Sequence, residues 1–253
     1  MKATPFLNDP APGWQHDLPG PDDIDSNFPE SEDNIIYLEF KIDTFKIRGL
    51  LAWLGIILII SSLILQQDTL ALLSDQTIRF DIWIFSIASL TCAGGLWGGV
   101  VAFRTDVFLP RHESIRFNRA RRKVYLYHYK SNWRKPFSRE WRVNISTYCW
   151  QNMHAEACER YGAMGAGGHM EAVMLSTRLP GTRDIAHRFL FSHQIAQGSL
   201  NWEVARRFMQ TGHIFPSAAE DRNYESAPLN LFWRFAPKVD WPADIDLESR
   251  TAP

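Results

Sequence analysis

Two long apolar runs separated by a short polar loop constrain this chain more than any other feature. They are residues 49–65 (GLLAWLGIILIISSLIL) and 82–103 (IWIFSIASLTCAGGLWGGVVAF), and neither contains a charged residue. As helices they would extend roughly 26 and 33 Å, close to the roughly 30 Å hydrocarbon thickness of a bilayer. A helix also pairs its own backbone amides, as lipid requires. We therefore predict a two-span transmembrane hairpin; a pair of buried core helices in a soluble domain is the alternative.

The distribution of charge predicts how the hairpin is oriented. The net charge of −1 conceals an acidic segment before residue 45 and a basic segment over residues 104–142. Lysines and arginines flank both apolar runs on their outer sides, whereas the loop 66–81 holds three aspartates and only Arg79. Because basic flanks are retained in the cytoplasm, we expect both termini to be cytoplasmic. A bacterial inner membrane is the expected location.

The second apolar run carries four glycines in two overlapping small-xxx-small spacings: Gly94, Gly95, Gly98 and Gly99. Glycines four residues apart form a flat face that another helix can approach closely. This face could pack the second span on the first, or it could mediate a homo-oligomer or the docking of another membrane protein. The sequence does not separate these interpretations.

The rest of the chain is predicted to be a membrane-anchored α+β arrangement. Residues 1–34 form an acidic, Pro-rich flexible arm, and residues 35–48 a possible strand and membrane entry. Residues 104–216 hold short aromatic and β-branched runs typical of an antiparallel β domain, with a hairpin turn at 119–122. One amphipathic helix, with Ser199 as its N-cap and Gly212 and Pro216 at its end, closes the domain. We suspect a pleckstrin-homology-like barrel, with an α+β sandwich as the alternative, and expect an extended tail over 217–253.

The residues that usually carry catalysis or bind metals lack a recognisable arrangement. Cys92, Cys149 and Cys158 show no CxxC spacing, and no HExxH or GxSxG motif occurs. Six of the eight histidines, at positions 128, 154, 169, 187, 193 and 213, are not spaced as a helical metal site. The glycine run 162–168 lacks the order of a phosphate-binding loop. We expect neither enzymatic activity nor a cofactor or metal.

The basic segment is the best functional signal outside the apolar runs. Its candidate site residues are Arg104, Arg111, Arg116, Arg119, Arg121, Arg122, Lys123, Arg134 and Lys135. Placed directly after a span, they could bind anionic headgroups or a protein partner, or they could only set the topology. Nucleic-acid binding is a further reading, because Tyr125, Tyr127 and Trp133 alternate with the charges, but membrane tethering argues against it.

Three segments, IRFNRARRKVYLYHY, NWEVARRFMQTGHIFP and PKVDWPADI, resemble an uncharacterised bacterial family of two-span proteins from about residue 34 onwards. That family carries a domain of unknown function and is often encoded beside type VI secretion effector genes. The resemblance implies a Gram-negative inner-membrane protein in interbacterial competition, and it assigns no functional residues. The first hypothesis is an immunity protein that neutralises a membrane-acting toxin. The second is a membrane-tethered adaptor that binds an effector or a secretion component, and a lipid-sensing module is a third.

Overall fold

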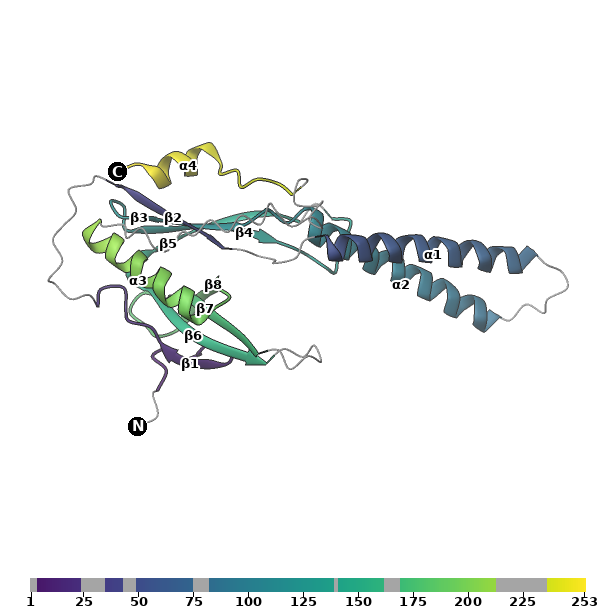
Figure 1. The fold of residues 1–253 in the computed structure, drawn as a ribbon, viewed down its shortest axis with the longest axis horizontal. Helices are drawn as coiled ribbons and strands as arrows, with labels where there is room; N and C mark the ends of the chain where they lie inside the picture. The colour runs from purple at the N-terminus through teal and green to yellow at the C-terminus, as the bar shows by residue number, and fades with distance from the viewer. Residues whose placement is uncertain are drawn as a thin grey trace.

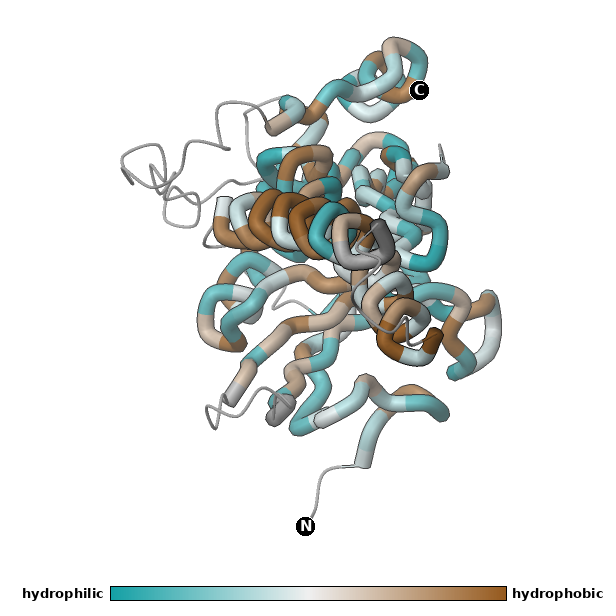
Figure 2. Tube along the Cα trace, turned by 90° about the vertical axis from the view of Figure 1, so that its right-hand side faces the viewer, coloured by the Kyte–Doolittle hydropathy of each residue, from teal (hydrophilic) through white to brown (hydrophobic). Residues whose placement is uncertain are grey.

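A computed structural model describes residues 4–23, 35–42, 49–74, 82–138, 141–161, 169–212 and 236–253. Two long helices project side by side from one end of a domain built of two β-sheets and further helices (Figure 1). These two helices carry the longest hydrophobic stretches of the chain (Figure 2). The predicted order of two apolar helices, then antiparallel strands, then a later helix is therefore confirmed.

The apolar runs form α1 (Leu50–Ser74) and α2 (Ile82–Val107), which pack on each other as an antiparallel pair. Both helices are long and apolar enough to cross a membrane by length and composition. Each continues past its predicted end, α1 beyond Leu65 and α2 beyond Phe103. The extension adds polar residues to α1, such as Thr69, whose hydroxyl donates to the Leu65 carbonyl at 2.7 Å. An α-helix pairs its backbone whatever the polarity of its side chains, so its end need not coincide with the end of an apolar run.

The first sheet has the order β2-β3-β4-β5, and every neighbouring pair is antiparallel. Its strands are β2 (Tyr37–Ile42), β3 (Glu113–Asn118), β4 (Lys123–Lys130) and β5 (Arg142–Cys149). The strand and hairpin predictions here are confirmed, including the 119–122 turn, where Arg122 adopts a φ of 53°. Because β2 and β3 are neighbours in the sheet, the α1–α2 hairpin is an insertion between two paired strands.

The second sheet has the order β1-β6-β7-β8 and is also antiparallel. Its strands are β1 (Trp14–Asp17), β6 (Met153–Tyr161), β7 (His169–Arg178) and β8 (Ile185–Ser192). A 3₁₀ turn, η1 (Trp150–Asn152), separates β5 of the first sheet from β6 of the second. The glycine run 162–168 lies outside the described residues.

The main hydrophobic core lies between the two sheets and α3 (Ile195–Thr211). Each sheet contributes alternate residues of its strands, and α3 contributes an apolar stripe: Ile115, Phe117, Val124, Leu126, Met153, Ala155, Val173, Leu175, Trp202 and Phe208. The described strands form two separate sheets, so the suspected closed barrel is not observed. The sandwich arrangement accounts for the core, because burying one face of each sheet needs no closure.

The N-cap of helix α3 lies five residues before the predicted N-cap, Ser199. Its N-cap is Gln194, and Ser199 lies inside the helix. The backbone of Gly198 approaches the second sheet so closely that a Cβ there would lie 2.5 Å from Cγ2 of Val173. The predicted end is confirmed, since Gly212 adopts the left-handed conformation with φ of 81°. Pro216 lies outside the described residues.

The N-terminal arm is packed over residues 4–23, contrary to the prediction of a flexible segment for 1–34. Leu7, Ala11 and Leu18 are buried, and β1 pairs with β6. The indole of Trp202 on α3 also donates to the Pro19 carbonyl at 2.9 Å. Few apolar residues suffice to order this segment, because backbone pairing and polar contacts with the domain supplement them.

The C-terminal segment is not simply extended, contrary to the prediction for residues 217–253. Residues 243–250 form a short helix, α4 (Ala243–Arg250), which lies on the outer face of the first sheet (Figure 1). Trp241 packs there on Tyr125 and Tyr127. The predicted apolar cluster of Leu229, Leu231, Phe232, Trp233 and Phe235 lies outside the described residues, as do 43–48 and the loop 75–81.

Candidate functional site

The four glycines of α2 divide into two pairs with different surroundings. A Cβ added at Gly95 would lie 2.2 Å from the Ser62 hydroxyl oxygen on α1. One added at Gly99 would lie 2.8 Å from the Gly55 carbonyl oxygen. In contrast, nothing lies within 4 Å of a Cβ at Gly94 or Gly98. The first pair therefore allows α1 and α2 to pack closely, while the second pair faces away from α1.

The open end of the hairpin is closed by Asp106 in the last turn of α2. Its Oδ2 accepts hydrogen bonds from the backbone amides of Gly49 at 2.7 Å and Ala52 at 3.0 Å. A carboxylate at this position satisfies amides that the first turn of α1 leaves unpaired and complements the helix dipole. Asp106 is buried. Its hydrogen bonds to the start of α1 join the two helices where they enter the domain.

Arg104, one of the predicted basic site residues, connects α2 to the loop between β4 and β5. Its guanidinium donates to the carbonyls of Pro136 and Ser138, the latter at 3.2 Å. The same group lies over the Trp141 ring, 4.9 Å from its centroid. Arg104 thus holds this loop beside the end of the second helix.

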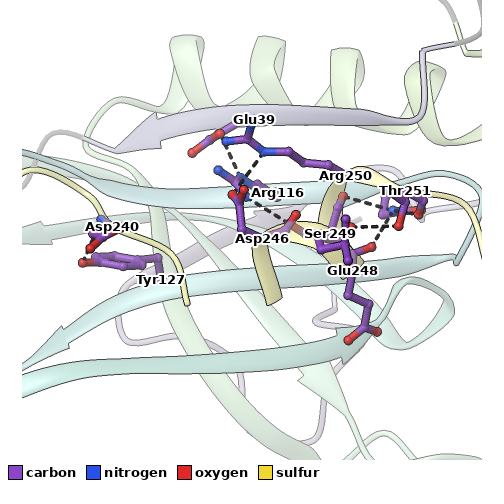
Figure 3. Close-up of polar contacts among 11 residues, drawn as sticks. Glu39, Arg116, Tyr127, Asp240, Asp246, Glu248, Ser249, Arg250 and Thr251 are labelled. Carbon is purple, nitrogen blue, oxygen red and sulfur yellow. Dashed lines mark hydrogen bonds and ion pairs between the residues drawn. The ribbon is translucent and has the colours of Figure 1, made fainter. Parts of the chain in front are cut away.

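Arg116 does not lie on an exposed basic surface, contrary to the prediction. Its side chain is only 2% exposed and donates to Glu39 at 2.9 Å and to Asp246 at 2.6 Å (Figure 3). It also donates to the Ser249 hydroxyl at 3.0 Å and lies 4.3 Å from the Trp241 ring centroid. The residue anchors the C-terminal segment to the centre of the first sheet.

Arg121 and Lys123 bind the same C-terminal segment. The Arg121 guanidinium donates to the carbonyls of Thr251 at 3.0 Å and Ala252 at 2.9 Å. The Lys123 ammonium contacts Glu248 at 2.8 Å, and the Tyr125 hydroxyl donates to the same carboxylate at 3.0 Å. These two hydrogen bonds lower the pKa of Glu248. Burial, together with the hydrogen bond to Glu248, raises the pKa of Tyr125.

Arg119 and Arg122 lie at the C-terminal end of α3. Arg122 donates to the Met209 carbonyl at 2.8 Å and pairs with Asp22 at 3.2 Å. Arg119 places its Nη1 only 2.6 Å from where a Cβ on Gly212 would be. Cations at this end of a helix complement its dipole. Both residues therefore stabilise the junction between the turn after β3, α3 and the N-terminal segment.

Arg111 lines a pocket at the edge of the C-terminal segment. The pocket has a volume of about 330 Å³ and is lined by Glu39, Arg111, His112, Arg116, Lys238, Val239 and Trp241. The Arg111 backbone amide donates to the Pro237 carbonyl at 3.1 Å. Arg116 in this lining is already paired with Glu39 and Asp246.

The remaining two basic site residues, Arg134 and Lys135, lie on the exposed β4–β5 loop. The Arg134 guanidinium lies 5.4 Å from the centroid of the neighbouring Trp133 ring. The structure therefore does not unite the predicted basic residues. Most of them attach the terminal segments and the hairpin to the domain, whereas Arg134 and Lys135 stay at the surface.

A polar cluster that the sequence analysis did not identify lies under the N-terminal segment. Glu156 on β6 is fully buried and accepts hydrogen bonds from the Ala11 amide and the Ser176 hydroxyl, both at 2.9 Å. Arg188 on β8 contacts it at 3.3 Å. The alternation of His154 and Glu156 with apolar residues in β6 could have indicated a polar outer face. The covering segment could not be inferred from that pattern.

The same segment brings Asp17 to the buried His154, with 3.2 Å between carboxylate and imidazole. Burial by itself would raise the pKa of Asp17, but hydrogen bonds from Trp14, His154 and the Phe6 amide outweigh it and lower that pKa. No group of three or more His, Cys, Asp or Glu side chains within the described residues could hold a metal ion. Cys92 and Cys158 are buried and Cys149 is exposed, and all three are free thiols.

These features define a class of protein: a two-sheet α+β domain that carries two long apolar helices between neighbouring strands of one sheet. The sequence model of a family of unknown function (DUF6708) matches residues 96–227, more than half of the 253 residues. The chain belongs to this family. The match runs from the middle of α2 to residue 227, past the end of α3. Neither the curated proteins nor the solved structures contain a match.

Proposed function

We propose that this chain is a two-span protein of a bacterial inner membrane, with its folded domain in the cytoplasm. Only 17% and 11% of the most apolar stretches of α1 and α2 are buried, whereas core helices of a soluble domain would be mostly buried. Apolar side chains such as Leu63 and Leu90 point outward with 55% and 75% exposure. The hairpin is inserted between two paired strands, which supports the view that both its ends leave the membrane on one side.

The role we propose is that of a non-catalytic immunity protein that neutralises a membrane-acting toxin. The observation that carries this proposal is the outward-facing pair Gly94 and Gly98. A transmembrane helix of a toxin can approach closely where side chains are absent. The resemblance to a two-span family encoded beside type VI secretion effectors supports the same role. It also indicates where the toxin gene would be found.

The test is co-expression of the effector encoded beside this gene with the wild-type protein and with Gly94→Leu/Gly98→Leu. We expect the wild type to protect cells and the double variant to lose protection while its membrane level is unchanged. Leu90→Ala is the matched control, because it changes the same lipid-facing side without filling the glycine pair. Killing that is equal with and without the wild-type protein would refute the immunity role.

A membrane-tethered adaptor is the second candidate. Within the part of the chain that the structure describes, β5 has a single neighbouring strand, β4. An exposed strand edge of this kind can pair with an extended segment of another protein. The test is binding of the purified neighbouring effector to the full chain in nanodiscs. Binding that is abolished by Ile145→Pro on β5 and retained in Gly94→Leu/Gly98→Leu would favour the adaptor over the immunity role.

A further inference from the structure

We propose that the β4–β5 loop, residues 131–138, is a third membrane contact of this protein. It would insert Trp133 and Phe137 at the boundary between headgroups and acyl chains of an anionic bilayer. This inference rests on the proposed membrane anchoring by α1 and α2. It adds a site at which the domain itself, and not only its hairpin, recognises lipid.

The loop presents its large apolar side chains to the outside. Trp133 is 57% exposed and Phe137 is 76% exposed. Hydrophobic groups of this size are costly to leave in water, and two of them on one short loop mark an interaction site. Trp and Phe are also typical of segments that lie at membrane interfaces.

Internal hydrogen bonds hold the loop in this exposed shape. The Lys135 amide donates to the Asn132 carbonyl at 3.0 Å, and the Ser138 amide donates to the Lys135 carbonyl at 3.1 Å. The Trp141 indole donates to the carbonyls of Asn132 and Lys135 at 3.0 and 3.2 Å. The exposed rings are therefore carried by an ordered framework, which lowers the entropic cost of inserting them.

The position of the loop along α2 indicates a lipid partner. The Trp133 ring lies 5.8 Å from that of Trp97, in the second half of α2. The loop carbonyls of Pro136 and Ser138 bind Arg104 in the last turns of the helix. The loop thus runs beside the helix from Arg104 to Trp97. A hydrocarbon layer of roughly 30 Å that begins near Ile82 would cover about 20 residues of α2. It would therefore end between Trp97 and Arg104, the stretch of the helix beside which the loop lies.

The charges on the loop suit anionic headgroups. Arg134 and Lys135 follow Trp133 directly and are exposed, and the Arg134 guanidinium lies over the Trp133 ring. Tryptophan prefers the interface, and basic residues next to it attract the negative surface of the cytoplasmic leaflet. A protein partner would not require contact between the loop and a membrane-spanning helix, so we favour lipid.

The experiment uses the full chain in nanodiscs with Cys92, Cys149 and Cys158 replaced by alanine. A nitroxide label is placed at Phe137→Cys, with Leu90→Cys on α2 as the lipid reference. Leu179→Cys, in the exposed turn between β7 and β8, is the water reference. Collision rates of the label with oxygen and with a water-soluble nickel chelate report its surroundings. We expect the label at position 137 to favour oxygen, as at position 90, and the label at position 179 to favour the chelate.

The outcomes separate this inference from the proposal on which it rests. If position 90 reports lipid and position 137 reports water, the loop contact is refuted and the membrane anchoring stands. If position 90 also reports water, the anchoring itself fails. A label at position 137 shielded from both reagents would mean that protein covers the loop, which refutes the lipid contact.

A second measurement tests the charge preference. Nanodiscs of phosphatidylcholine alone are compared with nanodiscs that also contain phosphatidylglycerol. We expect the oxygen preference at position 137 to rise with phosphatidylglycerol, and Arg134→Gln/Lys135→Gln to abolish that rise. The label at position 179 should not respond to either change. An equal oxygen preference at position 137 in both lipids would overturn the assignment to anionic headgroups.

Discussion

Arg116 on β3 donates a hydrogen bond to Asp246 on α4 at 2.6 Å, although 130 positions separate them in the chain. The guanidinium also binds Glu39 of the neighbouring strand β2. One buried cation therefore connects the strand before the hairpin, the strand after it and the C-terminal helix (Figure 3). A residue that the sequence places in a basic surface is instead a central structural contact.

Replacing Arg116 should release the C-terminal segment. Arg116→Ala leaves Glu39 and Asp246 without their partner, and breaking a buried pair costs about 3–5 kcal/mol. Because these carboxylates are 26% and 34% exposed, we expect a loss near the lower limit, about 3 kcal/mol. The measurement is chemical unfolding in detergent micelles, together with hydrogen exchange of residues 243–250.

Arg142→Ala is the matched control for this experiment. Arg142 lies on β5 of the same sheet and is exposed, so its removal should change stability by less than about 0.5 kcal/mol. Unchanged hydrogen exchange of α4 in the Arg116 variant would contradict the anchoring role.

The two glycine pairs of α2 should respond differently to the same substitution. Gly95→Val introduces a side chain where the Ser62 hydroxyl lies 2.2 Å from the Cβ position, so it should separate α1 from α2. Gly94→Val meets no atom within 4 Å and should leave the hairpin intact. The distance between nitroxide labels at Leu63→Cys on α1 and Leu90→Cys on α2, both exposed, reports the separation in a background without the native cysteines. An equal increase of this distance in both variants would show that the glycine pairs are not distinct.

Gly198 and Ser199 offer a test of where α3 begins. Gly198→Ala places a methyl 2.5 Å from Cγ2 of Val173 and 2.8 Å from Cβ of Ser192. We expect a net destabilisation of about 1–3 kcal/mol, although alanine favours helix formation by about 1 kcal/mol. Ser199→Ala should be close to neutral, because Ser199 is inside the helix. A loss of about 1 kcal/mol in thermal unfolding of the serine variant would restore Ser199 as an N-cap.

The pair formed by His128 and Glu113 should make stability depend on pH. The imidazole lies 2.8 Å from the carboxylate, and this hydrogen bond raises the pKa of His128 above its ordinary value of 6.5. The pair contributes its full share of the free energy of unfolding below pH 6.5, where His128 is protonated in both the folded and unfolded states. Its contribution is lost as the pH rises through the raised folded pKa.

The measurement is the thermal midpoint in micelles at about pH 5.5 and about pH 8.5. The fall in midpoint between the two should be smaller in His128→Gln than in the wild type. The exposed His193→Gln serves as the control and should retain the wild-type dependence. The effect should be modest, since the His128 side chain is half exposed. An identical pH dependence in wild type and His128→Gln would contradict the prediction.

The strands of the first sheet were predictable because their cause is local. The alternation in KVYLYHYK indicates an extended segment with two different faces, and the structure forms β4 over those residues. The sequence did not show that both faces are buried. Tyr125 and Tyr127, which alternate with charges, are covered by Trp241 of the C-terminal segment.

The candidate site was harder to predict because its contacts also join segments that are far apart in the sequence. Arg116, Arg121 and Lys123 lie close together in the sequence and look like one surface patch. Their partners Asp246, Thr251 and Glu248 lie more than 120 positions away. Charge patterning along the chain reveals an excess of cations but not which carboxylates and carbonyls will neutralise them. Arg134 and Lys135 lie on the β4–β5 loop, which runs beside α2, and they stay exposed.

Local pattern alone was enough to establish two apolar helices, an antiparallel β region and a glycine-terminated helix, since each depends on neighbours a few residues apart. Folding in three dimensions decided which sheet each strand joined, which glycines met α1, and which charges became internal anchors. Those outcomes depend on contacts between distant segments, and their free energies come from burial and pairing that no short stretch of sequence contains.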